Sequence, residues 1–177
     1  MHLKGYNDTG IQEIIDKAGL PKGSFYNFFK SKEDFGLLVI DYFMEFYTKM
    51  LTKYLADKSL PPLGRIRHLN KWFKNSFQSN KYTLGCPIGN FAQEMGDTSK
   101  VFQAKIKTSI DTIVQYFSDV LHEAQDLGHL SKSLDPDQTA RFFFNSWEGA
   151  LMSMKVEKSI KPLETHEQFL FDYILKA

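Results

Sequence analysis

The chain has 177 residues, a formal net charge of +1, a single cysteine and 15% aromatic residues. This length permits one compact unit or a small module joined to a larger one. The near-zero net charge excludes a protein that the electrostatic field of its whole surface attracts to nucleic acid, so any DNA affinity must come from a local patch of charge. One cysteine excludes an internal disulfide framework, and the lack of a long apolar run or a signal-peptide pattern predicts a cytoplasmic protein with no membrane partner.

The pattern of residues 9 to 34 predicts two short helices around a glycine turn, followed by the start of a third helix. Thr9 and Gln12 have the spacing of a capping box, which predicts that Thr9 begins the first helix. Gly19 is typical of a helix end because glycine tolerates a positive φ, and Pro21 suits the first turn of the next helix. The inward face of the second helix is expected to carry Phe25, Phe28 and Phe29.

Two short helices joined by a glycine turn match a helix-turn-helix, whose second helix enters the major groove of DNA. From Lys17 to Lys32 the chain carries four lysines and no acidic residue, and lysines at helix edges suit phosphate contacts. Ser24, Tyr26 and Asn27 carry hydroxyl and amide groups suited to base edges. An ordinary helical hairpin with solvated lysines fits equally well, so the pattern alone leaves both interpretations open.

The rest of the chain is predicted to be helical, because no alternating strand pattern persists. Ser31 and Asp34 form a second capping box, and Asp135 before Pro136 is typical of an N-cap followed by an N1 proline. The helix after Ser31 is expected to bury a stripe of Phe35, Leu38, Val39, Tyr42, Phe43, Phe46 and Met50. The expected helices cover residues 32–56, 63–78, 87–95, 99–127 and 136–156, with a last helix ending near residue 175. The fold class is therefore all-α, with an N-terminal helix-turn-helix unit at 1–34 and a helical regulatory and dimerisation body at 35–177.

The run GYNDTGIQEIIDKAGLPKGSFYNFFKSKEDF, residues 5 to 35, resembles the DNA-binding signature of the TetR family of bacterial repressors. The resemblance implies a repressor that binds double-stranded operator DNA as a homodimer and is released by a small apolar or electrophilic effector. It implies that Thr9 and Lys32 contact phosphate at helix starts. The DNA-binding residues implied are Thr9, Gly10, Pro21, Lys22, Gly23, Ser24, Tyr26, Asn27, Lys30 and Lys32.

Family members carry a further helix before this signature, and only Met1 to Lys4 match its end here. We therefore expect the 1–34 unit to be truncated at its start. This expectation leaves a second function open, a helical small-molecule-binding or dimerisation protein without DNA binding in this truncated form.

A stripe of small residues on the 136–156 helix indicates a surface that another helix approaches closely. Its members are Ser146, Gly149, Ala150 and Ser153. From the residues alone, tight packing within one chain is slightly favoured over a dimer interface as the explanation of this stripe. A helix-turn-helix protein needs a twofold partner to bind two half-sites, and the family resemblance implies a dimer built on the last two helices, so we favour the interface.

Cys86 precedes Pro87 and is predicted to cap the 87–95 helix, where free N–H groups and the helix dipole favour a thiolate. A small buried core residue is the commoner role of an intracellular cysteine. The runs LPKGSFYNFFKSKEDFG, GC at 85–86 and WEGALMSMKVEKSIKPLE resemble the branch of the family that contains the N-ethylmaleimide reductase repressor, which senses electrophiles and oxidants through cysteine. This resemblance implies Cys86 as the sensor and Lys155 as its neighbour.

The competing hypothesis is a non-covalent ligand in an aromatic pocket, since small ligands bind in apolar concave sites with a few polar groups. Gln93 and Asn145 are the polar groups expected there, and each aromatic residue is equally compatible with plain core. The candidate pocket residues are Trp72, Phe73, Phe77, Phe91, Tyr116, Phe117, Phe143 and Trp147.

No sequence motif indicates catalysis, a cofactor or a metal. The chain has no phosphate-binding glycine loop, no dinucleotide-binding pattern and no nucleophile elbow. Its five histidines are scattered without metal-ligand spacing. We therefore expect no catalytic residues, no metal site and no cofactor.

Overall fold

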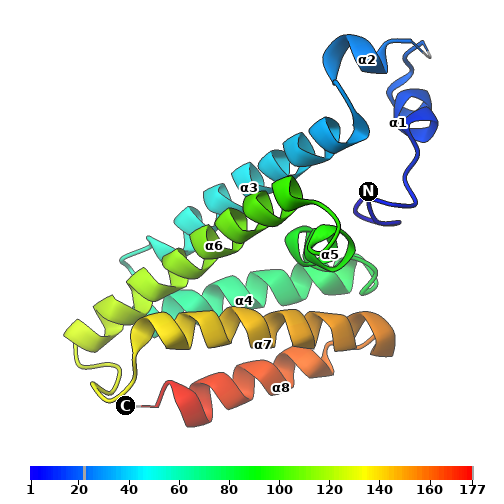
Figure 1. Ribbon diagram of the computed structural model, residues 1–177. Coiled ribbons are helices and arrows are strands. Elements are labelled where there is room, and N and C mark those ends of the chain that lie inside the picture. Colours follow the sequence, from blue (N-terminus) through cyan, green and yellow to red (C-terminus); the bar gives the residue numbers. More distant parts are fainter. Residues whose placement is uncertain (22, 177) are drawn as a thin grey trace.

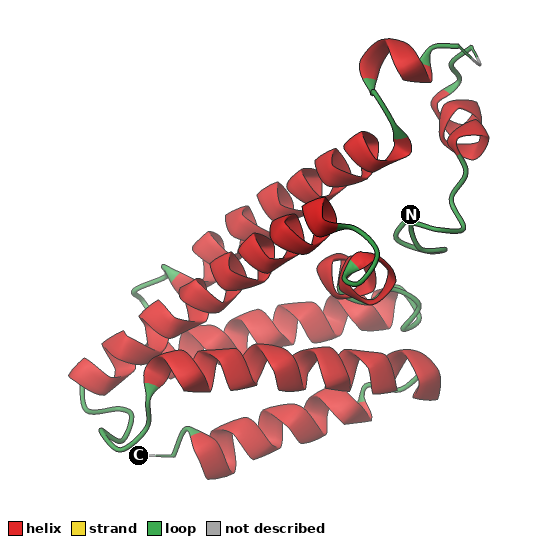
Figure 2. Ribbon diagram, viewed as in Figure 1, coloured by secondary structure: helices red, strands yellow, loops and turns green. Residues whose placement is uncertain are grey.

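The computed structural model describes residues 1–21 and 23–176, and within them the secondary structure is helical, without strands (Figure 2). The elements are α1 (Ile11–Ala18), α2 (Phe25–Phe28), α3 (Lys32–Leu55), α4 (Pro62–Ser79), α5 (Pro87–Met95), α6 (Lys100–Asp126), α7 (Pro136–Glu157), α8 (Lys161–Phe169) and a π-helical turn at Leu170–Ile174. The all-α prediction is confirmed, and each predicted helix of the body is present with its ends shifted by a few residues at most. None of these helices is both long and apolar enough to cross a lipid bilayer.

The helices form a small N-terminal reader and a larger body (Figure 1). We use "reader" for residues 1–31, which include α1 and α2 at one end of α3. The long helices α3 and α6 pack side by side, and α6 also packs on α4, α5 and α7. Helix α7 packs against α6 and also against α8. The short helix α5 lies between the body and the N-terminal segment, so it contacts both parts of the molecule.

Local capping chemistry explains why several helices begin where they do. The Ser31 hydroxyl accepts a hydrogen bond from Asp34 N, and Ser99 does the same for Phe102 N at the start of α6. The Asp135 carboxylate accepts from the N–H groups of Asp137 and Gln138, directly before Pro136. Such caps satisfy N–H groups that have no partner inside the helix, so these starts are set by neighbouring residues.

The reader differs from its prediction in two ways. Thr9 is not a cap: α1 begins after Gly10 without a side-chain cap, and the Thr9 hydroxyl donates instead to Gly5 O at 2.7 Å. The second helix is shorter than expected, because residues 23 and 24 form a turn and only Phe25–Phe28 are helical. Phe25 is buried as predicted, and Phe25 and Phe29 both pack on Phe35 of α3, whereas the Phe28 side chain is 71% exposed.

The predicted stripe of α3 is partly wrong. Leu38, Tyr42 and Phe46 are exposed, and the residues buried on this helix are Gly36, Ile40, Met50, Leu51 and Leu55. Gly36 is required at the crossing with α6, because a Cβ there would overlap the rings of Phe102 and Tyr6. With aromatic residues on several faces of α3, periodicity does not determine which face is buried.

Candidate functional site

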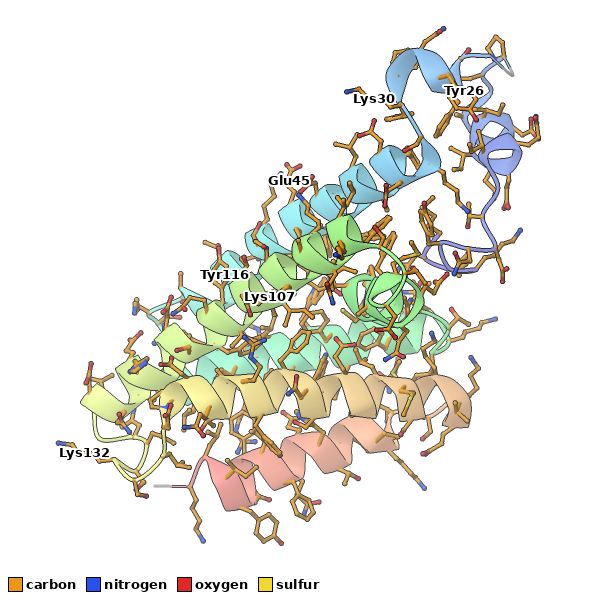
Figure 3. All side chains as sticks on the ribbon, viewed as in Figure 1. Tyr26, Lys30, Glu45, Lys107, Tyr116 and Lys132 are labelled. Carbon is orange, nitrogen blue, oxygen red and sulfur yellow. The ribbon has the colours of Figure 1, made fainter. Side chains whose placement is uncertain are left out.

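Most predicted DNA-binding residues lie on the exposed end of the reader. Tyr26 and Lys30 are exposed at the tip formed by α1 and α2 (Figure 3), and the Tyr26 side chain is 64% exposed. Ser24 is half-buried beside them. Gly10, Pro21, Gly23 and Asn27 are exposed. The prediction for Lys22 lies outside the described residues.

Thr9 and Lys32 are directed inward in this structure. The Thr9 side chain is buried with its hydroxyl on Gly5 O, and the Lys32 ammonium donates to Asn7 O at 3.2 Å and lies 4.5 Å from the centre of the Tyr6 ring. Both residues hold the segment that precedes α1. A phosphate contact by either remains a prediction.

A carboxylate on α5, which the sequence interpretation missed, ties the reader to the body. Glu94 accepts hydrogen bonds from the backbone N–H groups of Tyr6 at 3.0 Å and Asn7 at 2.8 Å. Gly5 lies so close to the Glu94 carboxyl that a Cβ added at Gly5 would overlap it. The Tyr6 ring packs against Phe91 and Phe102 with centroid separations of 6.0 and 5.1 Å. The end of α5 therefore clamps the chain just before α1.

Cys86 caps the other end of α5. Its sulfur accepts a hydrogen bond from Gly89 N at 3.4 Å, which confirms the predicted N-cap position. The residue is buried, and the Tyr47 hydroxyl and the Glu148 carboxyl are its neighbours. Burial raises the pKa of the Cys86 thiol, and the negative charge of Glu148 raises it further, against the opposing effect of the Gly89 hydrogen bond. These effects favour the thiol form, so the surroundings of the sulfur resemble those of a buried core cysteine more than those of a reactive thiolate.

Lys155 lies near the backbone of Cys86 rather than beside its sulfur. Its ammonium donates to Asn90 Oδ1 at 3.5 Å, and its stem covers Gly85 so closely that an added Cβ would lie 3.0 Å from Lys155 Cδ. The charged group that shifts the pKa of the thiol is the acidic Glu148, whereas the resemblance implied the basic Lys155 as the neighbour.

An apolar cavity of about 30 Å³ lies beside Cys86, between α3, α4, α6 and α7. Five of the predicted pocket residues line it, namely Phe73, Phe77, Phe117, Phe143 and Trp147. The other three do not. Phe91 packs under Tyr6, Trp72 packs on Phe46 and Tyr54, and the Tyr116 hydroxyl lies 3.1 Å from Thr52 Oγ1 on the outer side of the α3–α6 pair (Figure 3).

The polar groups of the cavity are Asn70, Tyr47 and Glu148. The predicted polar groups, Gln93 and Asn145, are both exposed and lie elsewhere. A signal for the correct groups exists in the sequence: Asn70 shares a helical face with Phe73 and Phe77, and Glu148 shares one with Phe144 and Leu151. Polar residues at apolar positions of a helix are candidates for a buried site.

The predicted dimer residues lie on the outer side of α7. Ser146, Gly149, Ala150 and Ser153 line an open groove between α7 and α8. The Ser146 hydroxyl donates to Phe142 O and lies 2.9 Å from His166 Nε2 on α8. Phe142 and Phe169 line the groove and are exposed in the single chain, and further exposed apolar side chains on α7 and at the C-terminal end of the chain are Met152, Val156 and Tyr173. The stripe thus borders an uncovered apolar face.

Two family descriptions match the chain, and together they cover most of it. Residues 1–36 match "Bacterial regulatory proteins, tetR family", and residues 62–170 match "Tetracyclin repressor-like, C-terminal domain". The transcriptional regulator AcuR of Cereibacter sphaeroides is 36% identical over 162 residues, which cover 92% of this chain and 74% of AcuR. The crystal structure of regulatory protein TetR from Rhodobacter sphaeroides is 35% identical and has a TM-score of 0.89 over 94% of this chain and 88% of that chain.

The expected likeness to the branch that contains the N-ethylmaleimide reductase repressor, NemR, is also confirmed. The HTH-type transcriptional repressor NemR of Escherichia coli K12 is 27% identical over 91% of this chain and 81% of NemR. The crystal structure of its reduced form has a TM-score of 0.85 and covers 93% of this chain and 86% of that chain. Regulators of this kind bind operator DNA and form dimers. With both parts of the fold matched and relatives named as transcriptional regulators and repressors, the chain belongs to the TetR family.

Proposed function

We propose that the protein is a dimeric repressor whose reader leaves operator DNA when a small molecule occupies the cavity beside Cys86. The observation that carries the proposal is the placement of α5. One end of this helix contributes Cys86 to the cavity wall, and the other end holds the reader through Glu94. A ligand that shifts the start of α5 therefore shifts the backbone segment before α1.

The proposed DNA contacts come from the exposed tip of the reader. Tyr26 and Asn27 suit base edges, and Lys30 suits a phosphate. The proposed dimer forms through the groove and apolar face of α7 and α8, where a second copy would cover the exposed rings and aliphatic side chains. A twofold arrangement would present two readers to two half-sites.

The test of DNA binding uses the intact chain and labelled DNA from its own promoter region, followed by fluorescence anisotropy. We expect affinity to fall as salt rises, because phosphate contacts release counter-ions. Tyr26→Ala is expected to weaken binding about tenfold, the lower range of a lost base contact. Tyr42→Ala, an equally exposed tyrosine on α3, is the matched control. Binding that is absent, or unchanged by salt and by Tyr26→Ala, would favour a ligand-binding or dimerising protein without a DNA role.

A second signal, covalent modification of Cys86, is favoured by one observation, the match to NemR and its reduced form. An electrophile bonded to the sulfur would have to displace Tyr47 or Glu148, since both are its neighbours. This movement would act on the same helix, α5. Treating the DNA complex with a mild electrophile tests the idea: if Cys86→Ser releases DNA as readily as the unmodified protein does, the thiol has no part in the signal.

A further inference from the structure

We propose that the cavity beside Cys86 binds a small organic cation, an amine with only a few non-hydrogen atoms, and that Glu148 is its counter-ion. This inference deepens the proposed function, because it assigns a chemical class to the effector of the same cavity. It is carried by the composition of the cavity wall, by two buried polar groups without partners, and by the cavity volume.

The cavity wall combines aromatic rings with a single acidic group. Rings of Tyr47, Phe73, Phe117 and Trp147 come from α3, α4, α6 and α7, so they surround the space from several sides. No lysine, arginine or histidine is among the described residues that line it. Ring faces carry negative partial charge and attract cations, most strongly in sites that exclude water. A wall of this composition disfavours an anion, which would meet Glu148 with no compensating positive charge.

Glu148 is the acidic group, and it has no counter-ion among the residues that the structure describes. Its Oε1 atom is buried without a hydrogen-bond partner. The Glu148 carboxyl also packs directly on Gly89 of α5, because a Cβ added at Gly89 would overlap Oε2 of Glu148. Burial raises the pKa of Glu148, which is the usual response of a carboxyl that lacks a compensating charge. An ammonium group placed against Oε1 would supply both the charge and the hydrogen-bond donor.

Asn70 adds a requirement for an acceptor atom on the ligand. Its side chain is 1% exposed, and its Nδ2 group has no hydrogen-bond partner. A buried donor without a partner costs about 1–3 kcal/mol, so a ligand oxygen that accepts from it would bind more tightly. The two unpartnered groups therefore fit an amine that also carries a hydroxyl, ether or carbonyl oxygen.

The volume sets the size of the ligand. A water molecule needs roughly 10–15 Å³ of such space, so the cavity of about 30 Å³ holds the equivalent of two or three waters. An amine with about four non-hydrogen atoms is of this size. Water alone is the competing occupant, because it can also bridge Asn70 and Glu148.

The experiment compares three probes of similar size that differ in charge, the cation 2-aminoethanol, neutral ethylene glycol and the anion glycolate. Each is titrated at pH 7 into the DNA-free protein, and binding is followed by the change in tryptophan fluorescence, to which Trp147 at the cavity wall and Trp72 outside the cavity both contribute. We expect 2-aminoethanol to bind at least tenfold more tightly than the other two. Equal affinities, or no binding of the cation, would overturn the proposal and leave the cavity as a water site.

Glu148→Gln separates charge from shape, since the amide has the same size as the carboxyl. We expect this variant to lose the tenfold preference for the cation, whereas Glu45→Gln, an exposed exchange on α3, retains it. A melting curve checks that the variant folds. If Glu148→Gln keeps the preference for 2-aminoethanol, Glu148 is not the counter-ion.

The pH dependence gives a second measurement on the unmodified protein. Because burial raises the pKa of the free Glu148 carboxyl, the cation must displace a proton at low pH, and its affinity should rise as the pH increases and the carboxyl ionises. Cys86 and Tyr47 face Glu148, and both have raised pKa values, so they stay protonated while Glu148 ionises. An affinity that does not change with pH would contradict the proposal.

Release of operator DNA is measured separately, so the two proposals fail independently. If 2-aminoethanol binds through Glu148 but leaves the DNA complex intact, the ligand class stands and the effector role of the cavity fails. If other ligands release DNA and no cation preference exists, the effector role stands and the ligand class fails.

Discussion

Glu94 is one of the residues that join the helical body to the reader. Its carboxylate accepts from two consecutive backbone N–H groups, those of Tyr6 and Asn7, so it restrains the main chain rather than a side chain. Hydrogen bonds to a charged acceptor contribute more to the free energy of unfolding than hydrogen bonds between neutral groups. The contact places the chain entering α1 at a defined position relative to α5.

We expect Glu94→Gln to loosen this segment. The amide keeps one acceptor oxygen and loses the other, so one of the two hydrogen bonds is lost, at a cost of about 1 kcal/mol. Amide hydrogen exchange at Tyr6 and Asn7, followed by NMR, should become several-fold faster. Asp97→Asn, an exposed carboxyl-to-amide change just after α5, is the control. Unchanged exchange in Glu94→Gln would show that Glu94 does not hold the reader.

Cys86 offers a second prediction at this scale. Burial and the neighbouring Glu148 raise the pKa of the thiol, so little thiolate is present at neutral pH. We expect iodoacetamide at pH 7 to alkylate Cys86 at least tenfold more slowly than a cysteine in a short peptide. Glu148→Gln should react faster than the unmodified protein, because it removes the negative charge that opposes ionisation.

The control for accessibility is the same protein unfolded in urea, which should react at the rate of the peptide. Equal rates for folded protein and peptide would mean that the thiol is reactive, and the electrophile-sensing hypothesis would then be preferred to the ligand hypothesis.

At the scale of the elements, a buried arginine connects three helices of the body. Arg65 on α4 donates from Nη1 to Leu55 O at the end of α3, at 2.6 Å, and its Nη2 lies 2.6 Å from the Glu123 carboxylate on α6. The Arg65 side chain is 1% exposed. It satisfies a carbonyl at the end of α3 that has no partner within the helix, and it fixes the distance between α3 and α6.

Arg65→Met should destabilise the body by about 2 kcal/mol, because Leu55 O loses its buried donor, whereas Glu123 loses Arg65 but keeps its ion pair with Lys58. Arg141→Met is the matched control. Arg141 pairs with Asp111 at 2.6 Å, but both side chains are well exposed, and such pairs contribute less than about 1 kcal/mol. Urea denaturation measures both changes, and similar losses in the two variants would contradict the central role of Arg65.

At the scale of the whole molecule, the proposed function uses two copies of the chain, and the proposed interface between them is the face of α7 and α8. The groove lined by Gly149 and its small neighbours runs between exposed apolar side chains. A Cβ at Gly149 would meet nothing within 4 Å in the single chain. One chain therefore has room for a Cβ at Gly149, and we expect a larger side chain there to occupy the groove that the proposed partner would fill.

We expect Gly149→Leu to shift the protein from dimer to monomer and to weaken operator binding accordingly. Gly149→Ala is the control, since it keeps the residue small and should stabilise α7 by about 0.5–1 kcal/mol through its higher helix propensity. Analytical ultracentrifugation distinguishes the two states. A Gly149→Leu protein that remains dimeric would place the interface elsewhere.

The sequence by itself determined those features that depend on neighbouring residues. Ser31, Asp135 and Cys86 cap helices as predicted, because a cap is made within three positions of the residue that it serves. Helical periodicity likewise predicted the helices of the body. These two inferences need only local geometry, whereas the family was predicted by the resemblance of residues 5 to 35 to the TetR signature.

Only the tertiary structure decided which side chains meet across helices. Phe91 and Phe143 both lie on apolar helix faces, yet one packs under the reader and the other lines the cavity. Glu148 faces Cys86, where Lys155 was expected, because the rotation of α7 relative to α5 selects the neighbour. A helical period identifies a buried face but not the partner of that face, since the crossing of distant helices depends on how all their side chains pack together.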